Sequence, residues 1–319
     1  MSVRIILVTP AGVHSRAGNR ITATRWARAL RSLGHRVAVQ MDWDGGSADA
    51  LIALHAWRSA ASVARYRSRF PAGPVIVALT GTDVHRFLRT HEETTRRSLE
   101  HADVLIALHD LVRDMLPAEF RAKVQVVHQS VGNPGLVRHP SQRTFDVCVV
   151  GHLRREKDPL RAAWAVRDLP AASRLRVLHA GGARDPDWAG IARGETIRNP
   201  RYHWLGDLPG WRVRRLYARA HTMVISSVME GGANVVSEAV VGGLPVIASR
   251  IPGNVGLLGP DHPGYFPPED TEALRALLLR AESDPGFLDD LARHGAARAP
   301  LFTPERERET WRRLLEAFA

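Results

Sequence analysis

The sequence contains a single cysteine, Cys148, among its 319 residues. One cysteine excludes a disulfide framework and a cysteine-based zinc site, and its place in the apolar run 147–150 predicts a buried, inert thiol. No apolar run approaches the roughly 20 residues that cross a bilayer, so we expect no membrane span. Residues 1–4 lead directly into a predicted strand with no visible secretory signal, and we therefore expect a cytoplasmic protein.

Aromatic and acidic residues are both scarce. Aromatic residues make up 6% of the chain, and 44 lysines and arginines against 33 acidic residues give a net charge of +11. Such an excess suits a nucleic acid or another anionic surface. The arginines are scattered along the predicted helices without the interleaved aromatic side chains that stack on bases, which favours solvated helix faces and no nucleic-acid partner. A basic nucleic-acid or surface binder stays the non-enzyme alternative, and part of the charge is available for an anionic substrate.

Short apolar runs alternate with helical segments along the chain, which predicts parallel α/β structure in two domains. The expected strands cover 3–8, 36–41, 49–54, 74–79, 104–108, 124–127, 144–150, 175–180, 201–205, 222–225 and 246–249. The expected helices cover 21–33, 56–69, 211–220, 233–241, 271–280 and 285–294, and a last helix begins at Thr303 as its N-cap. Residues 251–254 are expected to form a loop. Glycines and prolines in 129–143 indicate a linker, so we expect domains over 1–135 and 141–302.

The stretch 226–238 combines a glycine turn with two carboxylates between a predicted strand and a predicted helix. Gly231 and Gly232 carry no Cβ, so amides at the helix start can approach a phosphate. Glu230 and Glu238 offer acceptor oxygens that suit sugar hydroxyls. A nucleotide sugar carries both kinds of group. A tight turn with two solvated glutamates is the alternative for this motif alone.

The longer run from Ser226 to Pro252, with Glu238-Ala239 and Gly242-Gly243-Leu244-Pro245, resembles the donor-binding signature of GT-B glycosyltransferases that carry Glu-x7-Glu. The resemblance implies an α/β fold of two Rossmann-like parallel-sheet domains facing across a cleft, with the final helix, 303–319, packing back on the first domain. It also implies a UDP-sugar as substrate, with no cofactor and no metal. Glu238 would hold the ribose and Glu230 the donor sugar. The donor-binding residues that it implies are Glu238, Gly231, Gly232, Ala233, Asn234, Gly206, Asp207, Leu208 and His152.

The turn after the expected strand 144–150 is cationic. Glu-x7-Glu enzymes have a glycine, an arginine and then a lysine in this turn, which bind the donor diphosphate, and Lys157 matches that lysine. His152 stands at the usual arginine position, a departure from the pattern, and we expect Arg154 to supply the cation instead. The resemblance therefore implies Lys157, Arg154 and Glu230 as catalytic residues, with a plain cationic surface turn as the alternative.

Two loops of the first domain are candidate acceptor sites. The loop before the helix 21–33 is rich in small and cationic residues and looks like the first glycine loop of GT-B enzymes. The run Thr80-Gly81-Thr82-Asp83 follows a strand at the carboxyl edge, where open α/β sheets bind ligands. A plain connection and a helix cap at Asp83 are the respective alternatives. The expected acceptor-binding residues are Arg16, Gly18, Asn19, Arg20, Thr80, Thr82 and Asp83.

In finer detail the chain is most similar to the small group of selenosugar synthases of selenoneine biosynthesis. The resemblance rests on Thr9-Pro10-Ala11, Gly18-Asn19-Arg20, Thr80-Gly81-Thr82-Asp83 and Glu230-Gly231-Gly232-Ala233-Asn234-Val235. It implies transfer from a UDP-sugar, with UDP-N-acetylglucosamine expected, to selenophosphate, giving a selenosugar, UDP and phosphate. Selenophosphate needs no strong general base, and the sequence marks no base for a hydroxyl acceptor. A hydroxyl acceptor on a sugar, lipid or small metabolite is the leading alternative; the anomeric outcome and the oligomeric state stay open.

Overall fold

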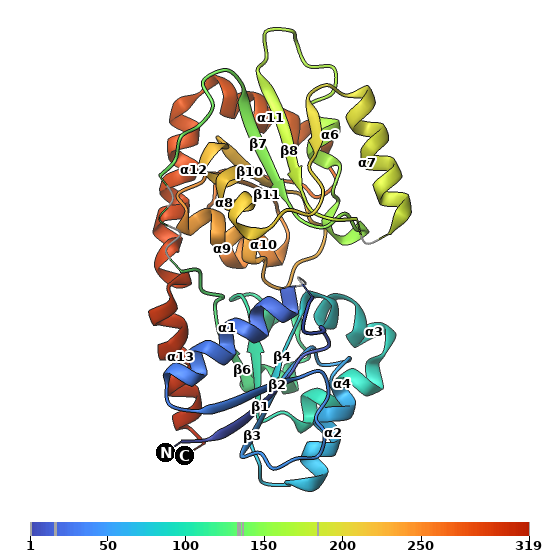
Figure 1. Ribbon diagram of the computed structural model, residues 1–319, viewed down its shortest axis with the longest axis vertical. Coiled ribbons are helices and arrows are strands. Elements are labelled where there is room, and N and C mark those ends of the chain that lie inside the picture. Colours follow the sequence, from blue (N-terminus) through green and yellow to red (C-terminus); the bar gives the residue numbers. More distant parts are fainter. Residues whose placement is uncertain (1, 16–17, 133–134, 136, 184, 319) are drawn as a thin grey trace. The chain divides into compact units, whose positions relative to one another are not determined.

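The structure is a computed structural model that describes the chain except for residues 1, 16–17, 133–134, 136, 184 and 319. It consists of two compact units (Figure 1). Unit 1 is Met1–Ser130 with Leu301–Ala319, and unit 2 is Val131–Pro300. Each unit contains one six-stranded sheet whose paired strands are all parallel. The predicted fold class, two Rossmann-like α/β units with parallel sheets, is confirmed.

The sheet of unit 1 has the order β2-β1-β3-β4-β5-β6. Apolar side chains cover both of its faces, which is why its strands have nearly continuous apolar sequences. The order changes direction between β1 and β3, and the carboxyl edge at such a point is where open α/β sheets bind ligands. The strands are β1 Arg4–Val8, β2 Arg36–Gln40, β3 Ala50–Leu54, β4 Val75–Ala78, β5 Val104–Ala107 and β6 Val124–Val126.

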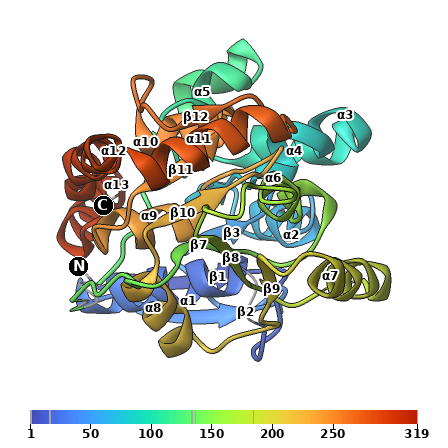
Figure 2. The ribbon, with the colours of Figure 1, turned by 90° about the horizontal axis from the view of Figure 1, so that it is seen from above.

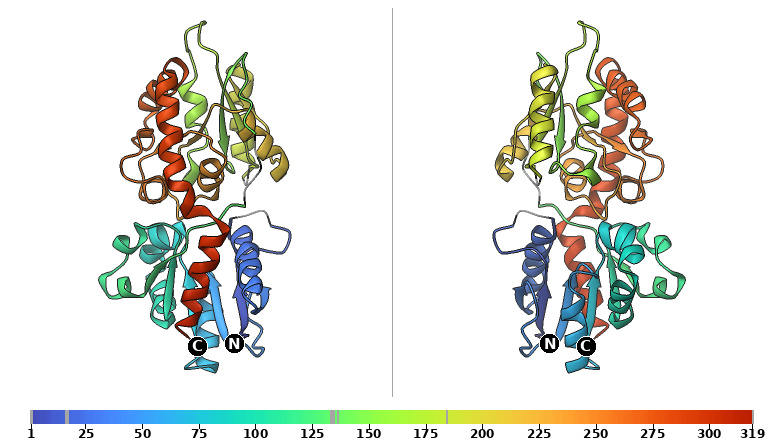
Figure 3. Two further views of the ribbon diagram at one scale, coloured as in Figure 1. Left: turned by 90° about the vertical axis from the view of Figure 1, so that its left-hand side faces the viewer. Right: turned by 90° about the vertical axis from the view of Figure 1, so that its right-hand side faces the viewer.

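The helices of unit 1 include one from the far end of the sequence. Helix α13 lies beside α1 (Figure 3), and the rings of Trp26 and Trp311 meet edge to face with centroids 4.9 Å apart. Thr303 caps α13 by accepting a hydrogen bond from the Arg306 amide, as the sequence predicts. The helices are α1 Gly18–Ser32, α2 Ala60–Arg69, η1 Asp83–Phe87, α3 Leu88–Thr90, α4 Glu92–His101, α5 Val112–Met115, η2 Ala118–Lys123 and α13 Pro304–Glu316.

A buried carboxylate joins α13 to the rest of unit 1. Glu307 is 3% exposed and accepts hydrogen bonds from Arg25 Nε and Trp26 Nε1, each at 3.0 Å. The hydroxyl of Ser130, the last residue before unit 2, donates to its other oxygen at 2.5 Å. One side chain therefore ties together the first helix, the last helix and the end of the first segment of unit 1.

The sheet of unit 2 has the order β12-β11-β10-β7-β8-β9, which the strand labels follow in Figure 2. Successive strands are added on one side of β7 up to β9 and on its other side from β10 onward. This reversal of strand order between β7 and β10 is typical of dinucleotide-binding sheets. Cys148 on β7 is fully buried, as predicted, and burial raises the pKa of its thiol, which disfavours the reactive thiolate. The strands are β7 Phe145–Val150, β8 Leu175–Ala180, β9 Tyr202–Trp204, β10 Thr222–Ile225, β11 Val246–Ser249 and β12 Tyr265–Phe266.

One segment of unit 2 differs from its prediction. Residues 251–254 were expected to form a loop, but α10 begins at Pro252, where a proline fits the first turn of a helix. None of the helices in the described part of the chain is long and apolar enough to span a membrane. The helices are η3 Arg155–Lys157, α6 Arg161–Ala165, α7 Pro186–Arg198, α8 Gly210–Arg219, α9 Asn234–Val241, α10 Pro252–Leu258, α11 Thr271–Ser283, α12 Pro285–Arg298 and η4 Ala299–Phe302.

The segment predicted as a linker belongs largely to unit 2. Among its described residues no helix or strand forms. Arg138 donates to the carbonyl oxygens of Gly243 at 2.7 Å and Ala220 at 2.8 Å, and the His139 amide donates to Ala218 O at 2.8 Å. These bonds hold the segment against α8 and the end of α9. The passage from unit 1 to unit 2 is consequently placed at Ser130.

Candidate functional site

The loops after β7, β8 and β9 come together at the carboxyl edge of unit 2. An added Cβ on Gly181 would stand 1.8 Å from the carbonyl oxygen of Gly151, and one on Gly182 would stand 3.3 Å from the Cβ of Asp207. The backbone of these turns can approach this closely only without side chains. The glycines therefore build a compact rim at the end of the sheet.

His179 on β8 fixes the first of these turns. It is fully buried, with Nε2 3.0 Å from Gly151 O and Nδ1 3.0 Å from the Tyr202 hydroxyl oxygen. Burial lowers the pKa of His179 to about 4, against a smaller opposite effect of the Gly151 carbonyl. A neutral imidazole has one N–H, so we assign Nε2–H as the donor to Gly151 and Nδ1 as the acceptor from Tyr202.

Lys157 and Glu230 meet where the strand order of unit 2 reverses. Lys157 closes η3 after β7, Glu230 follows β10, and their Nζ and Oε1 atoms form an ion pair. The Ser227 hydroxyl donates to the same Oε1 at 2.6 Å. The two side chains are 19% and 8% exposed, so the pair is only partly screened by solvent. The structure thus brings together two residues that the sequence predicts to act on the donor.

The glycine turn after Glu230 is held from the other side by α10. A Cβ on Gly253 would stand 2.6 Å from both the Cβ and the carbonyl oxygen of Glu230, so α10 packs directly on that backbone. Gly232 has a φ of +143°, outside the range that other residues readily adopt. Ala233 is buried and Asn234 opens α9. The expected phosphate-binding turn therefore has a well-defined backbone.

Glu238 lies on α9 and has a partner that the sequence does not predict. The Tyr217 hydroxyl, on α8, donates to Glu238 Oε2 at 3.0 Å. Burial first and the Glu238 carboxylate second raise the pKa of Tyr217 well above 10, so the phenol keeps its proton. Tyr217 therefore orients a carboxylate without adding charge. No spacing rule connects the two, because they are 21 residues apart on different helices.

The remaining expected donor residues lie on the β8–β9 side of the same edge. His152 is half-buried, with its Nδ1 3.7 Å from the position of a Cβ on Gly182, which also faces Asp207. Gly206 has a φ of +70°, and Leu208 is half-buried. Arg154 is exposed at the start of η3. The loop after β7 therefore carries His152 toward one side of the edge and Lys157 toward the other.

Asp83 in unit 1 is part of the protein interior. It is 0% exposed, and its carboxylate accepts hydrogen bonds from the amides of Ala56, Trp57 and Thr80 and from the Thr80 hydroxyl, at 2.8–3.1 Å. Its Oδ1 is also 2.7 Å from His55 Nδ1. The expectation that Asp83 itself contacts an acceptor does not agree with this burial. Thr80, Gly81 and Thr82 are half-buried, so Thr80 and Thr82 are the members of the motif whose side chains have accessible surface.

His55, directly after β3, is the functional candidate that the sequence analysis missed. Its side chain is 3% exposed, and its φ of +77° is unusual for a residue other than glycine. Its Nε2 lies 3.3 Å from Thr82 Oγ1. The signal in the sequence was a polar residue directly after the apolar run 49–54, at the edge where ligands bind.

The glycine loop of unit 1 leads into α1 earlier than predicted. Gly18, Asn19 and Arg20 form the first turn of α1, with Asn19 and Arg20 half-buried. Because α1 follows β1, this turn stands at the carboxyl edge of the sheet. Arg16 lies outside the described residues, so its expected role rests on the sequence alone.

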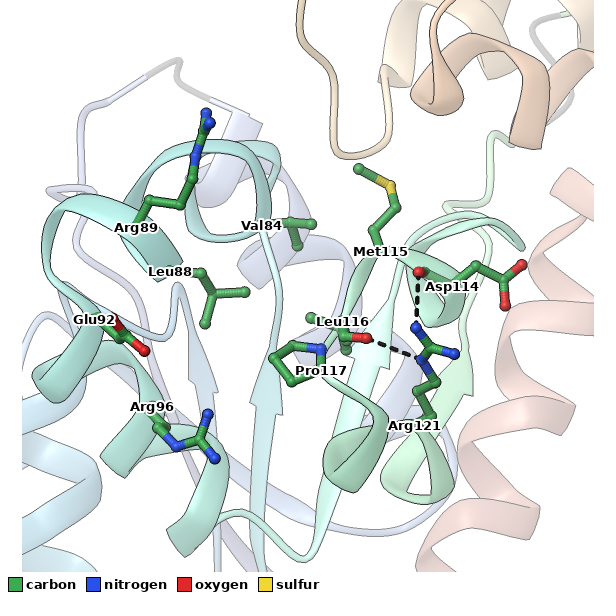
Figure 4. Close-up of a pocket in the computed structure, with 10 residues that line it drawn as sticks. All are labelled: Val84, Leu88, Arg89, Glu92, Arg96, Asp114, Met115, Leu116, Pro117 and Arg121. Carbon is green, nitrogen blue, oxygen red and sulfur yellow. Dashed lines mark hydrogen bonds between the residues drawn. The ribbon is translucent and has the colours of Figure 1, made fainter.

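A cavity of about 370 Å³ lies elsewhere in unit 1 (Figure 4). Arg121 donates to Leu116 O at 2.9 Å and to Asp114 O at 3.3 Å, and Arg96 pairs with Glu119 outside the lining. These arginines are thus engaged by the protein. In the described ranges no group of three or more His, Cys, Asp or Glu residues could hold a metal ion. The cavity is lined by Val84, Leu88, Arg89, Glu92, Arg96, Asp114, Met115, Leu116, Pro117 and Arg121.

The family described as glycosyl transferases group 1 matches residues 138–298, which is about half of the chain and nearly all of unit 2. The chain belongs to this family. Among curated protein sequences, none matches it significantly.

Solved structures show the same fold over the whole chain. Anabaena HepE in complex with UDP and glucose aligns with a TM-score of 0.78 at 15% identity, covering 99% of this chain and 100% of that one. Sucrose-phosphate synthase from Thermosynechococcus elongatus gives 0.77 at 19% identity, covering 98% and 99%. A glycosyltransferase from Rickettsia africae gives 0.75 at 15% identity, covering 99% and 98%. The chain therefore has the GT-B fold.

Proposed function

We propose that this protein transfers a sugar from a UDP-sugar, UDP-N-acetylglucosamine, to selenophosphate. The main support for a UDP-sugar donor is the Lys157–Glu230 ion pair, which lies at the point where the strand order of unit 2 reverses. Family membership and the UDP bound in HepE support the same assignment. We expect the protein to act in the cytoplasm on small-molecule substrates, without a metal or cofactor and without a nucleic-acid partner.

In this proposal each donor group has a defined role. Glu238, oriented by Tyr217, accepts hydrogen bonds from the ribose, and Glu230 contacts the sugar. Lys157, with Arg154, stabilises the negative charge that develops on the departing UDP. The amides from Gly231 to Asn234 bind phosphate at the start of α9. His152 and residues 206–208 complete the donor site on the β8–β9 side.

The acceptor half rests on the resemblance to selenosugar synthases and on charge. A selenium lone pair attacks the anomeric carbon, the bond from that carbon to UDP breaks, and hydrolysis of the phosphorus–selenium bond gives phosphate and the selenosugar. Selenophosphate is already an anion, so it needs cations such as Arg20 and, by sequence, Arg16, but no general base. Gly18, Asn19 and the hydroxyls of Thr80 and Thr82 would bind its oxygens.

The test is UDP release by the purified protein from UDP-N-acetylglucosamine, with and without selenophosphate. We expect selenophosphate to raise the rate well above the acceptor-free control and mass spectrometry to detect the selenosugar. Lys157→Met should abolish most of this rate, while Arg28→Met, at an exposed cation on α1 of unit 1, should leave it unchanged. UDP release that is the same with and without selenophosphate would overturn the acceptor assignment.

One observation favours a second candidate, a hydroxyl acceptor. The buried His55–Asp83 pair beside Thr82 is the type of arrangement that removes a proton from an alcohol, and selenophosphate has no need of one. The same assay with alcohols or water in place of selenophosphate separates the two candidates, because both consume the same donor.

A further inference from the structure

Four polar side chains form a closed hydrogen-bonded ring at the ends of β3 and β4, which are neighbouring strands of unit 1. The contacts are His55 Nδ1 to Asp83 Oδ1 at 2.7 Å, His55 Nε2 to Thr82 Oγ1 at 3.3 Å, Thr82 Oγ1 to Thr80 Oγ1 at 3.0 Å, and Thr80 Oγ1 to Asp83 Oδ2 at 2.8 Å. Asp83 and His55 are buried, whereas Thr80 and Thr82 are half-buried. The buried part of the ring thus consists of the Asp83 carboxylate and the His55 imidazole, and the accessible part consists of two threonine hydroxyls.

The direction of two of these bonds is fixed by Asp83. Three amides and one hydroxyl donate to its carboxylate, whose oxygens act as acceptors. Thr80 must therefore donate to Oδ2, and His55 Nδ1–H must donate to Oδ1. A longer contact of 3.4 Å from the Arg58 amide to Nδ1 would require the opposite tautomer. The 2.7 Å contact to a carboxylate decides the assignment.

With His55 neutral, the ring is one hydrogen short. Two contacts remain, Thr80 to Thr82 and Thr82 to Nε2, and only the Thr82 hydroxyl hydrogen is left to serve them. If Thr82 donates to Nε2, the oxygens of Thr80 and Thr82 face each other as two acceptors. A ligand that brings a hydroxyl hydrogen to this pair of oxygens supplies what the ring lacks.

We propose that Thr82 contacts an acceptor hydroxyl and that His55, acting through Thr82, is the positioning residue that takes up its proton. This inference rests on the proposed function in its hydroxyl form. As the acceptor oxygen bonds to the anomeric carbon, the bond from that carbon to UDP breaks. The acceptor proton passes to Thr82 Oγ1, and the Thr82 proton passes to His55 Nε2. Asp83 stabilises the resulting imidazolium, which afterwards releases its proton to water.

Three variants of the full chain test the relay, with water as the hydroxyl acceptor and UDP-N-acetylglucosamine as donor. His55→Gln and Thr82→Val should lower kcat for UDP release about 100-fold or more, the usual contribution of a proton-accepting group. Thr82→Ser keeps the hydroxyl and should stay within a few-fold of the parent. The matched control is His91→Gln, at an exposed histidine whose ring packs on Phe87 as the ring of His55 does, and it should leave kcat unchanged.

Two comparisons separate the relay from a merely structural role. UDP affinity, measured by calorimetry, should stay within a few-fold in Thr82→Val, because the proposed UDP site lies in unit 2 and UDP binding requires no proton removal. Nitrogen-15 NMR of the imidazole in the full chain should show neutral His55 with its proton on Nδ1 and an Nε2 signal that shifts in Thr82→Val.

A neutral His55 protonated on Nε2 would overturn the relay, and so would UDP release at the parental rate in His55→Gln or Thr82→Val. A parent protein that fails to bind UDP would instead contradict the proposed function. The imidazole tautomer is measured without any substrate, so it decides the assignment of the ring in either case.

Discussion

At the scale of single residues, the charged groups of unit 2 depend on uncharged partners. Glu238 is oriented by a phenol that burial keeps protonated, and Glu230 shares one oxygen between Lys157 and the Ser227 hydroxyl. Neutral donors fix the position of a carboxylate while leaving its charge in place. The predicted residues therefore supply the charges at the carboxyl edge of unit 2. Tyr217, which belongs to no motif, helps to fix their positions.

Removing the Tyr217 hydroxyl should weaken nucleotide binding. In Tyr217→Phe the Glu238 carboxylate loses the bond that orients it, and we expect UDP affinity to fall about 10-fold, which corresponds to about 1.4 kcal/mol. Calorimetric titration with UDP measures this. Tyr66→Phe, in unit 1, is the control and should bind UDP like the parent. Parental affinity in a correctly folded Tyr217→Phe would remove Glu238 from the ribose site.

At the scale of elements, strand β8 and the loop between α10 and β12 each carry a buried histidine, and the two make unit 2 sensitive to acid. Burial lowers the pKa of both His179 and His262 to about 4, and their Nε2 atoms bond to the carbonyl oxygens of Gly151 and Val246. An unfolded histidine has a pKa of about 6.5. Between these values the unfolded chain binds protons that the folded chain does not, so stability falls as pH decreases from about 6.5 to about 4.

The expected result is a melting temperature that decreases steadily below pH 6.5, with each histidine contributing up to about 1.4 kcal/mol per pH unit. Thermal unfolding followed by circular dichroism between pH 7.5 and 4.5 measures it. In His179→Gln the decrease should be shallower, although the variant starts from a lower melting temperature. A parental slope in that variant would show that His179 is not the group responsible.

The helices and strands also show which parts of the fold could be predicted from the sequence. Apolar runs such as 222–225 were correctly predicted as strands because burial on both faces leaves few polar positions. Pro252-Gly253 was wrongly read as a loop, since proline and glycine mark turns as well as helix starts, and only the packing of α10 on Glu230 separates the two. The His55–Thr82 contact spans 27 residues and has no periodicity, so only tertiary structure reveals it.

At the scale of the whole molecule, the family match and the structural similarity cover different lengths of the chain. The match covers 138–298, in unit 2, whereas the structural similarity to HepE covers 99% of the chain. The motifs of unit 2 accordingly predict a candidate donor site, which stays a prediction. In unit 1 the sequence predicted Thr80, Thr82 and Asp83 at the carboxyl edge but not their contact with His55, because that contact depends on β3 and β4 lying next to each other.

Unit 1 is not a continuous piece of sequence, and its last helix should be essential to it. A fragment ending at Ser130 would lack α13, and with it the ring that packs on Trp26 and the carboxylate that accepts from Trp26 and Arg25. We expect the fragment 1–130 to aggregate or to melt far below the full chain. Addition of a peptide covering 301–319 should restore cooperative unfolding, and a fragment that melts like the intact protein without it would contradict this.

The Glu307 carboxylate gives this discontinuity a further consequence for synthesis on the ribosome. The carboxylate that accepts a hydrogen bond from the Trp26 indole is synthesised 281 residues after Trp26. The first half of the chain therefore leaves the ribosome before the core of unit 1 can be completed. Unit 2 can close as soon as its own sequence is complete, whereas unit 1 must wait for the final helix. Of the two, unit 2 is thus the one able to mature first.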